Sequence, residues 1–166
     1  MSFDPVQHRM VPEQRWFEDF TLGERFALPS RTMTSGIFAA FQVASGDNHP
    51  VHYDREFCRR HGHADMLAHG FQVVIQTCAG AGLFPHMVED SLRGFIEQSS
   101  RFLAPVLLGD TVYPCLTVDE LSPNRSTGVI GLASTVHNQH GVLVMEGRHR
   151  YLLGKRTPTA AVPPSA

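Results

Sequence analysis

The sequence has no long hydrophobic run, no paired cysteines and no excess of positive charge. No stretch of about 18 apolar residues occurs, so we expect no membrane-spanning segment. The net charge is −2 without a basic cluster, so no nucleic-acid partner is expected. Cys58, Cys78 and Cys115 are widely spaced and form no CxxC pair, which argues against a disulfide framework or a cysteine zinc site. Together these absences favour a cytoplasmic protein.

The two ends of the chain also lack structural signals. Residues 1–14 mix charged residues with proline and have no apolar core of the kind found in signal peptides. Residues 155–166 are rich in proline, threonine and alanine, and we expect this tail to be disordered. The remaining length suits a single domain over residues 1–154, long enough to bury one core.

Alternating and turn-rich stretches predict a sheet. Four extended segments, separated by short turns containing Pro, Asn or Gly, cover residues 94–103, 111–121, 126–137 and 142–153. Strands joined in this way form an antiparallel sheet, and residues 26–33 supply a further strand. Its edge strands would favour pairing with a second copy, so we expect a homodimer or a higher homo-oligomer.

Helical spacing is clearest in three places. Thr34 and Ser35 offer an N-cap for a helix over 37–44, and a short helix is expected over 55–60. A longer apolar helix begins near Gly70 and ends before Pro85, with hydrophobic residues on nearly every side. Such a helix must be enclosed. We therefore predict an α+β fold in which a curved antiparallel sheet wraps a long central helix.

The stretch 45–54, SGDNHPVHYD, combines a carboxylate and an imidazole in one short loop, and AHG follows at 68–70. Asn48 and Pro50 disfavour a helix here, so Asp47 and His52 can converge from separate positions. A carboxylate, an imidazole and a backbone donor at Gly70 are the groups needed to move a proton and stabilise an oxyanion.

These residues resemble a known family. The run GD…PVHYD…AHG at 46–70 is similar to the hydratase motif of MaoC-like dehydratases and (R)-specific enoyl-CoA hydratases. A second block, RFLAPV…GDTV at 101–112, resembles the strand–turn–strand after the central helix of that family, and the likeness covers about 17–153. It implies a hotdog fold and reversible addition of water to a trans-2-enoyl thioester. Coenzyme A would enter only as part of the acyl-CoA substrate, and no other cofactor is implied.

The resemblance also implies roles for three residues. Asp47 would bind the water and take its proton, His52 would hold the same water or return a proton, and the N–H of Gly70 would be the oxyanion donor. Taken singly, Asp47 could be a turn residue and His52 a surface imidazole, while Gly70 could serve close helix–sheet packing. Six further residues are expected to contact substrate: Phe38, Phe41, Asn48, His49, His69 and Phe71.

Two positions depart from the family pattern. His49 replaces the usual asparagine before the proline, and Cys78 stands where these hydratases often carry serine. Both could change the substrate or the reaction. Cys78 itself is expected to be an inert core residue, and the ring of His69 to be hydrogen-bonded to loop backbone.

Other readings stay open. The sequence between 47 and 69 is dense in histidine and aspartate, yet its spacings match no recognised zinc pattern, so no metal is expected. A hotdog acyl-CoA thioesterase and a non-catalytic acyl-binding subunit are the alternative functions. The phosphates of coenzyme A could meet any of several basic residues: Arg93, Arg101, Arg148, Arg150 and Lys155.

Overall fold

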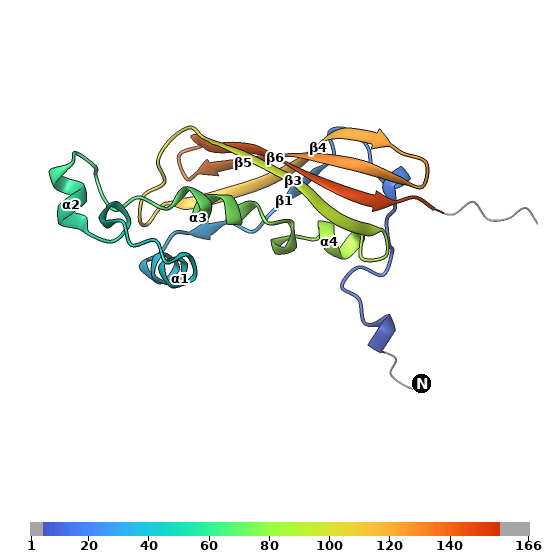
Figure 1. Ribbon diagram of the computed structural model, residues 1–166, viewed down its shortest axis with the longest axis horizontal. Coiled ribbons are helices and arrows are strands. Elements are labelled where there is room, and N and C mark those ends of the chain that lie inside the picture. The colour runs from blue at the N-terminus through green and yellow to red at the C-terminus, as the bar shows by residue number, and fades with distance from the viewer. Residues whose placement is uncertain (1–4, 157–166) are drawn as a thin grey trace, which may run out of the picture.

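The computed structural model describes residues 5–156, with the side chain of Val6 left aside. Its centre is one antiparallel sheet in the order β1-β4-β5-β6-β3, with β2 pairing β4 beside β1. Helices α1, α3 and α4 lie on one side of this sheet (Figure 1). The expected disordered tail lies outside the described residues apart from Lys155 and Arg156.

The predicted strands are confirmed with small changes in their ends. The long strands are β3 (Leu92–Phe102), β4 (Thr111–Pro123), β5 (Thr127–Asn138) and β6 (Leu143–Gly154). The single strand expected over 26–33 is instead two short ones, β1 (Arg25–Ala27) and β2 (Arg31–Thr32). Pro29 lies in the gap and has no N–H to donate, so it interrupts the pairing with β4.

The first two helices agree with their sequence signals. The hydroxyl of Thr34 accepts a hydrogen bond from the Ile37 N–H at the start of α1 (Ser35–Ser45). Asp54 caps α2 (Arg55–Arg60) in the same way. Side-chain oxygens at these positions satisfy backbone donors that have no partner inside the helix.

The prediction of one long central helix is wrong. The segment is broken into α3 (Gly70–Val74), 3₁₀ turns at 75–77 and 79–81, and α4 (Phe84–Met87). Cys78 adopts an extended ψ of 119°, which ends the helical path, and glycines on either side of Ala81 add no helical preference. The enclosure is also incomplete, since several side chains expected inside are exposed: Phe71, Ile75, Cys78 and Leu83.

The face of the sheet toward the helices carries the core. One buried cluster includes Met33, Phe38, Val73 and Val112, and Tyr53 of the motif loop packs against it. A buried polar link joins the broken helix to β6, where Nε2 of His149 lies 3.1 Å from the hydroxyl oxygen of Thr77. In the described part of the chain, no helix combines the length and apolar character needed to cross a bilayer.

Candidate active site

The motif loop is folded by its own polar groups. Helix α1 ends at Gly46, whose φ of 70° lies in the left-handed region that glycine adopts freely. The backbone N–H of His49 then donates to Oδ1 of Asp47 over 3.0 Å. The ring of His49 in turn accepts from the N–H of Val51 and caps the 3₁₀ turn Pro50–His52. This turn brings His52 back towards Asp47.

His52 is held in one tautomer. Its Nδ1 lies 2.7 Å from the carbonyl oxygen of Leu67. A carbonyl oxygen can only accept, so Nδ1 carries the hydrogen in this bond. In the neutral ring, Nε2 is then left with a free lone pair, which is the form required of a proton acceptor.

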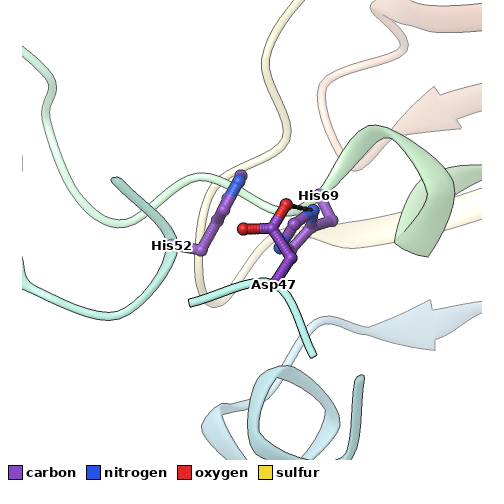
Figure 2. Close-up of side chains that lie close together, drawn as sticks. All are labelled: Asp47, His52 and His69. Atoms are coloured by element: carbon purple, nitrogen blue, oxygen red, sulfur yellow. Dashed lines mark ion pairs between the residues drawn. The ribbon is translucent and has the colours of Figure 1, made fainter. Parts of the chain in front are cut away.

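His69 completes a group of three side chains (Figure 2). Its ring stacks on that of His52 with centroids 3.6 Å apart and planes inclined by 22°. Its Nδ1 lies 3.6 Å from Oδ2 of Asp47. The other ring nitrogen, Nε2, is buried and has no hydrogen-bond partner among the described residues. His69 therefore lies against both residues of the predicted pair.

The charges of the group follow from these contacts. The hydrogen bond from the His49 N–H lowers the pKa of Asp47, and the neighbouring His69 and His52 rings act in the same direction. Burial lowers the pKa of His69, and the nearby His52 adds to this, while Asp47 opposes it. At neutral pH the site thus combines an ionised carboxylate with a neutral buried imidazole beneath His52.

The spacing of the three residues suits a bound water. One oxygen of Asp47 and one nitrogen each of His52 and His69 all lie within 4.8 Å of one another. Two hydrogen bonds of about 2.8 Å each can meet at one water across such a distance. A metal ion bound by both rings is less well served, because an imidazole lone pair lies in its ring plane and the planes of these two stacked rings are nearly parallel and separated.

Gly70 begins α3 beside this group. Its N–H has no hydrogen-bond partner within residues 5–156, because the first amides of a helix lack internal acceptors. A methyl group added at Gly70 would lie 2.8 Å from Cζ of Phe102. The ring of Phe102 thus fills the space that a side chain at residue 70 would take, so glycine allows this close contact. The backbone N–H of Gly70 points to no acceptor within residues 5–156 and can act as a donor.

Two of the residues expected to contact substrate line hollows near the group. Phe38, which is 3% exposed, lines a pocket of about 230 Å³ together with His52 and Tyr53. Phe41 lies with its ring centroid 5.1 Å from that of His69. Phe71 is not brought into the group, since it is 74% exposed. Asn48 bonds within the loop, to Gln42 and to the carbonyl of Gly46.

The sequence did not indicate that two further buried polar side chains lie beside the candidate site. The hydroxyl of Tyr53 is buried without a hydrogen-bond partner among the described residues, and its ring centroid lies 5.9 Å from that of His52. Within the same residues the side-chain nitrogen of Gln72 is unpaired, although its side-chain oxygen accepts from the His69 N–H. Polar atoms that stay unpaired in the interior are costly, and here they gather around the candidate site.

The basic residues considered for phosphate binding are largely engaged elsewhere. Arg101 pairs with Glu146, Arg148 with Asp119, and Arg150 with Glu97. Arg93 and Lys155 donate to backbone carbonyl oxygens. Contacts of these residues with coenzyme A stay a prediction.

Comparison with known proteins identifies the family of the chain. Residues 19–137 match the MaoC like domain. The chain belongs to the MaoC-like family.

Two relatives of this MaoC-like chain have named activities. One is the 3-hydroxybutyryl-CoA dehydratase of Methylorubrum extorquens, 29% identical over 144 residues that cover 83% of this chain and 85% of the relative. Another is the (R)-specific enoyl-CoA hydratase of Rhodospirillum rubrum, 28% identical over 145 residues, covering 85% and 93% respectively.

A solved structure names the fold. A protein of Mycobacterium tuberculosis with a double hotdog fold superposes with a TM-score of 0.72 and 24% identity. The match covers 90% of this chain and 47% of that protein. The MaoC-like chain therefore has the hotdog fold that the sequence predicted, with a broken rather than continuous helix.

Proposed function

We propose that this MaoC-like protein is a hydro-lyase that adds water reversibly to a trans-2-enoyl thioester. The observation that carries the proposal is the convergence of Asp47 and His52, with the acceptor nitrogen of His52 left free by the bond from Nδ1 to Leu67. The named activities of the two relatives support the same reaction class. An acyl-CoA is the proposed substrate, and the chemistry asks for no redox group.

In this proposal Asp47 and His52 act on the same water molecule in different roles. Asp47 accepts one hydrogen bond from it and orients it, because a carboxylate whose pKa is lowered is a weak base. Nε2 of His52 takes the proton as the oxygen bonds to the β-carbon of the substrate. These roles differ from those that the family resemblance implies, in which Asp47 takes the proton of the water. The imidazolium of His52 then delivers that proton to the α-carbon, so the elements of water are added in full.

Gly70 would stabilise the charge that develops on the thioester oxygen. As the electrons of the double bond move towards the carbonyl, that oxygen becomes enolate-like and needs a donor. The unpartnered N–H of Gly70 lies at the start of α3, next to His69. Backbone donors that are already in place need no rearrangement during the reaction, which makes them effective for this purpose.

A second copy of the chain is part of the proposal. Strand β3 lies at the edge of the sheet, and its exposed apolar side chains Phe95, Ile96 and Phe102 are unusual on a surface in contact with water. Phe71 and Ile75 expose further apolar area on the helical side. Pairing through this edge would cover them and would extend the sheet.

An assay with crotonyl-CoA separates this function from its alternatives. Hydration removes the absorbance of the conjugated enoyl thioester without releasing a free thiol. We expect that loss, and we expect it to be reversible from (R)-3-hydroxybutyryl-CoA. Release of coenzyme A thiol would instead identify a thioesterase, and the absence of both signals across several chain lengths would favour a binding subunit.

A further inference from the structure

An apolar groove runs between α1 and the broken central helix. It has a volume of about 250 Å³. Its α1 wall consists of side chains at helical spacings of three and four residues: Ile37, Ala40, Phe41 and Ala44. Ile75 and Gln76 form the opposite wall, and Arg31 is the charged residue in the lining.

The groove adjoins the candidate active site through Phe41. One side of this ring lines the groove, and its centroid lies 5.1 Å from the ring of His69. His69 in turn contacts both Asp47 and His52. An acyl chain whose reacting carbons lie at the Asp47–His52 pair could therefore continue past Phe41 into this groove.

Arg31 occupies an unusual place for a charged residue. In the register of β2 and β4 it is directly opposite Val112, and opposed residues of an antiparallel pair share one face of the sheet. Val112 is fully buried beneath the helices. Arg31 is thus on the helix-covered face at the sheet edge, rather than on the outer face where Arg148 and Arg150 form ion pairs.

Arg31 forms no ion pair with an acidic residue in the described part of the chain. Across residues 5–156 its guanidinium forms neither an ion pair nor a side-chain hydrogen bond, whereas most arginines of the chain pair with a carboxylate. Those pairs involve Arg9, Arg15, Arg55, Arg59, Arg101, Arg148, Arg150 and Arg156. The five donors of a guanidinium match a carboxylate in a two-point contact.

We propose that the groove binds the acyl tail of the substrate and that Arg31 binds a carboxylate at the end of that tail. The preferred substrate is then a trans-2-enoyl thioester of a dicarboxylic acid rather than of a simple fatty acid. This inference rests on the proposed hydro-lyase function and assigns its substrate class. The apolar walls hold the methylene groups, and Arg31 distinguishes a charged end from a methyl end.

Two other roles for Arg31 predict different behaviour. An exposed charged residue at a sheet edge, as Arg31 is, can discourage pairing of that edge with other chains. A guanidinium can also bind a phosphate of coenzyme A instead of an acyl carboxylate. In the first role, replacing Arg31 would change the assembly of the protein and not its kcat/KM. In the second role, replacing Arg31 would lower kcat/KM equally for every acyl-CoA.

The test compares matched substrates. We would measure kcat/KM for hydration of trans-2-enoyl-CoA thioesters with chains of six, eight and ten carbons, each ending in a methyl group or a carboxylate. The same acyl groups would be tested on pantetheine, which lacks the phosphates of coenzyme A. The variants are Arg31→Met, Arg31→Lys and, as a control, Arg125→Met, which removes an exposed arginine without a described partner from the β4–β5 turn. Thermal unfolding checks that each variant is folded.

We expect wild type to prefer the carboxylate series at one or more lengths, on both carriers. Arg31→Met should lower kcat/KM about tenfold for that series, the effect of one charge-assisted hydrogen bond, and leave the methyl series unchanged. Arg31→Lys should retain part of the preference, and Arg125→Met all of it.

Equal hydration of both series by wild type would overturn the assignment of Arg31 and leave the hydro-lyase function standing. An equal loss with every coenzyme A substrate but none with pantetheine would assign Arg31 to a phosphate and overturn it too. Hydration of neither series would overturn the proposed function itself.

Discussion

His52 and His69 stack face to face with ring centroids 3.6 Å apart, and Nδ1 of His52 lies 2.7 Å from the carbonyl oxygen of Leu67. Two imidazoles at this distance cannot easily both be charged, because like charges in contact disfavour each other. Burial also lowers the pKa of His69, which disfavours its charged form. In the proposed reaction His52 is therefore the ring assigned to take the proton, and His69 is assigned to position it.

Replacement of His52 by asparagine tests that division. The amide nitrogen of asparagine can replace Nδ1 and keep the bond to Leu67, while the acceptor at Nε2 is lost. We expect His52→Asn to lower kcat for crotonyl-CoA hydration about 10²–10⁴-fold with little change in thermal stability. His69→Asn should cost clearly less, since His69 acts by positioning Asp47 and His52. Equal losses in the two variants would show that the roles are assigned wrongly.

Gly70 has two tasks that a double variant separates. Gly70→Ala places a methyl group 2.8 Å from Cζ of Phe102, and because that ring is 55% exposed and can shift, we expect a loss of only about 1 kcal/mol in the free energy of unfolding. Adding Phe102→Ala removes the clash, and denaturant titration should then show little further cost of the alanine at 70. Hydration should stay reduced in the double variant relative to Phe102→Ala alone, because the methyl group still narrows the approach to the amide. Full recovery of activity would leave packing as the sole task of Gly70.

Much of this fold could be predicted because its signals are local. The cap at Thr34, the turn residues between the long strands and the alternation within them each depend on a few neighbouring residues. The broken helix is different. Its apolar spacing is helical, but the backbone leaves the helical region at Cys78, and the spacing of apolar residues does not report the conformation of a single residue.

The candidate site also has features that a local motif predicts and features that depend on distant residues. The motif placed Asp47 and His52 in one loop, and the structure brings them together. The tautomer of His52 depends on Leu67, fifteen residues away, and the close contact at Gly70 of helix α3 depends on Phe102 of strand β3. No short-range pattern records such contacts. The alanine-histidine-glycine run did mark His69 as a nearby residue, but not as a stacking partner of His52.

Acid should destabilise the protein through His149. Burial lowers the pKa of this histidine, which lies 3.1 Å from the hydroxyl of Thr77. As the pH falls through about 6.5, the ordinary pKa of histidine, residue 149 becomes protonated in the unfolded chain but stays neutral in the folded chain. Stability therefore rises with pH in this window and is lost on acidification. We expect the melting temperature to fall between pH 7.5 and 5.5, and His149→Gln to reduce that fall. An unchanged pH dependence in the variant would exclude His149 as a source.

The exposed edge of the sheet should control assembly. Ile96 is 50% exposed at the irregular pairing of β3 with β6, and Ile96→Glu would place a charge in the proposed contact between copies. Sedimentation should show an oligomer for wild type and a monomer for this variant. Val43→Glu, at an 87% exposed position on α1, is the matched control and should leave the mass unchanged. A wild-type monomer at all concentrations would contradict the proposed pairing.

The most direct test of the shared water is a double-mutant cycle on crotonyl-CoA hydration. Asp47→Asn, His52→Asn and the double variant would be compared with wild type under single-turnover conditions. If both side chains act on one water, the double variant should be about as slow as the worse single variant, because groups that act as a unit are not additive. Losses that multiply, or near wild-type rates in either single variant, would contradict the account.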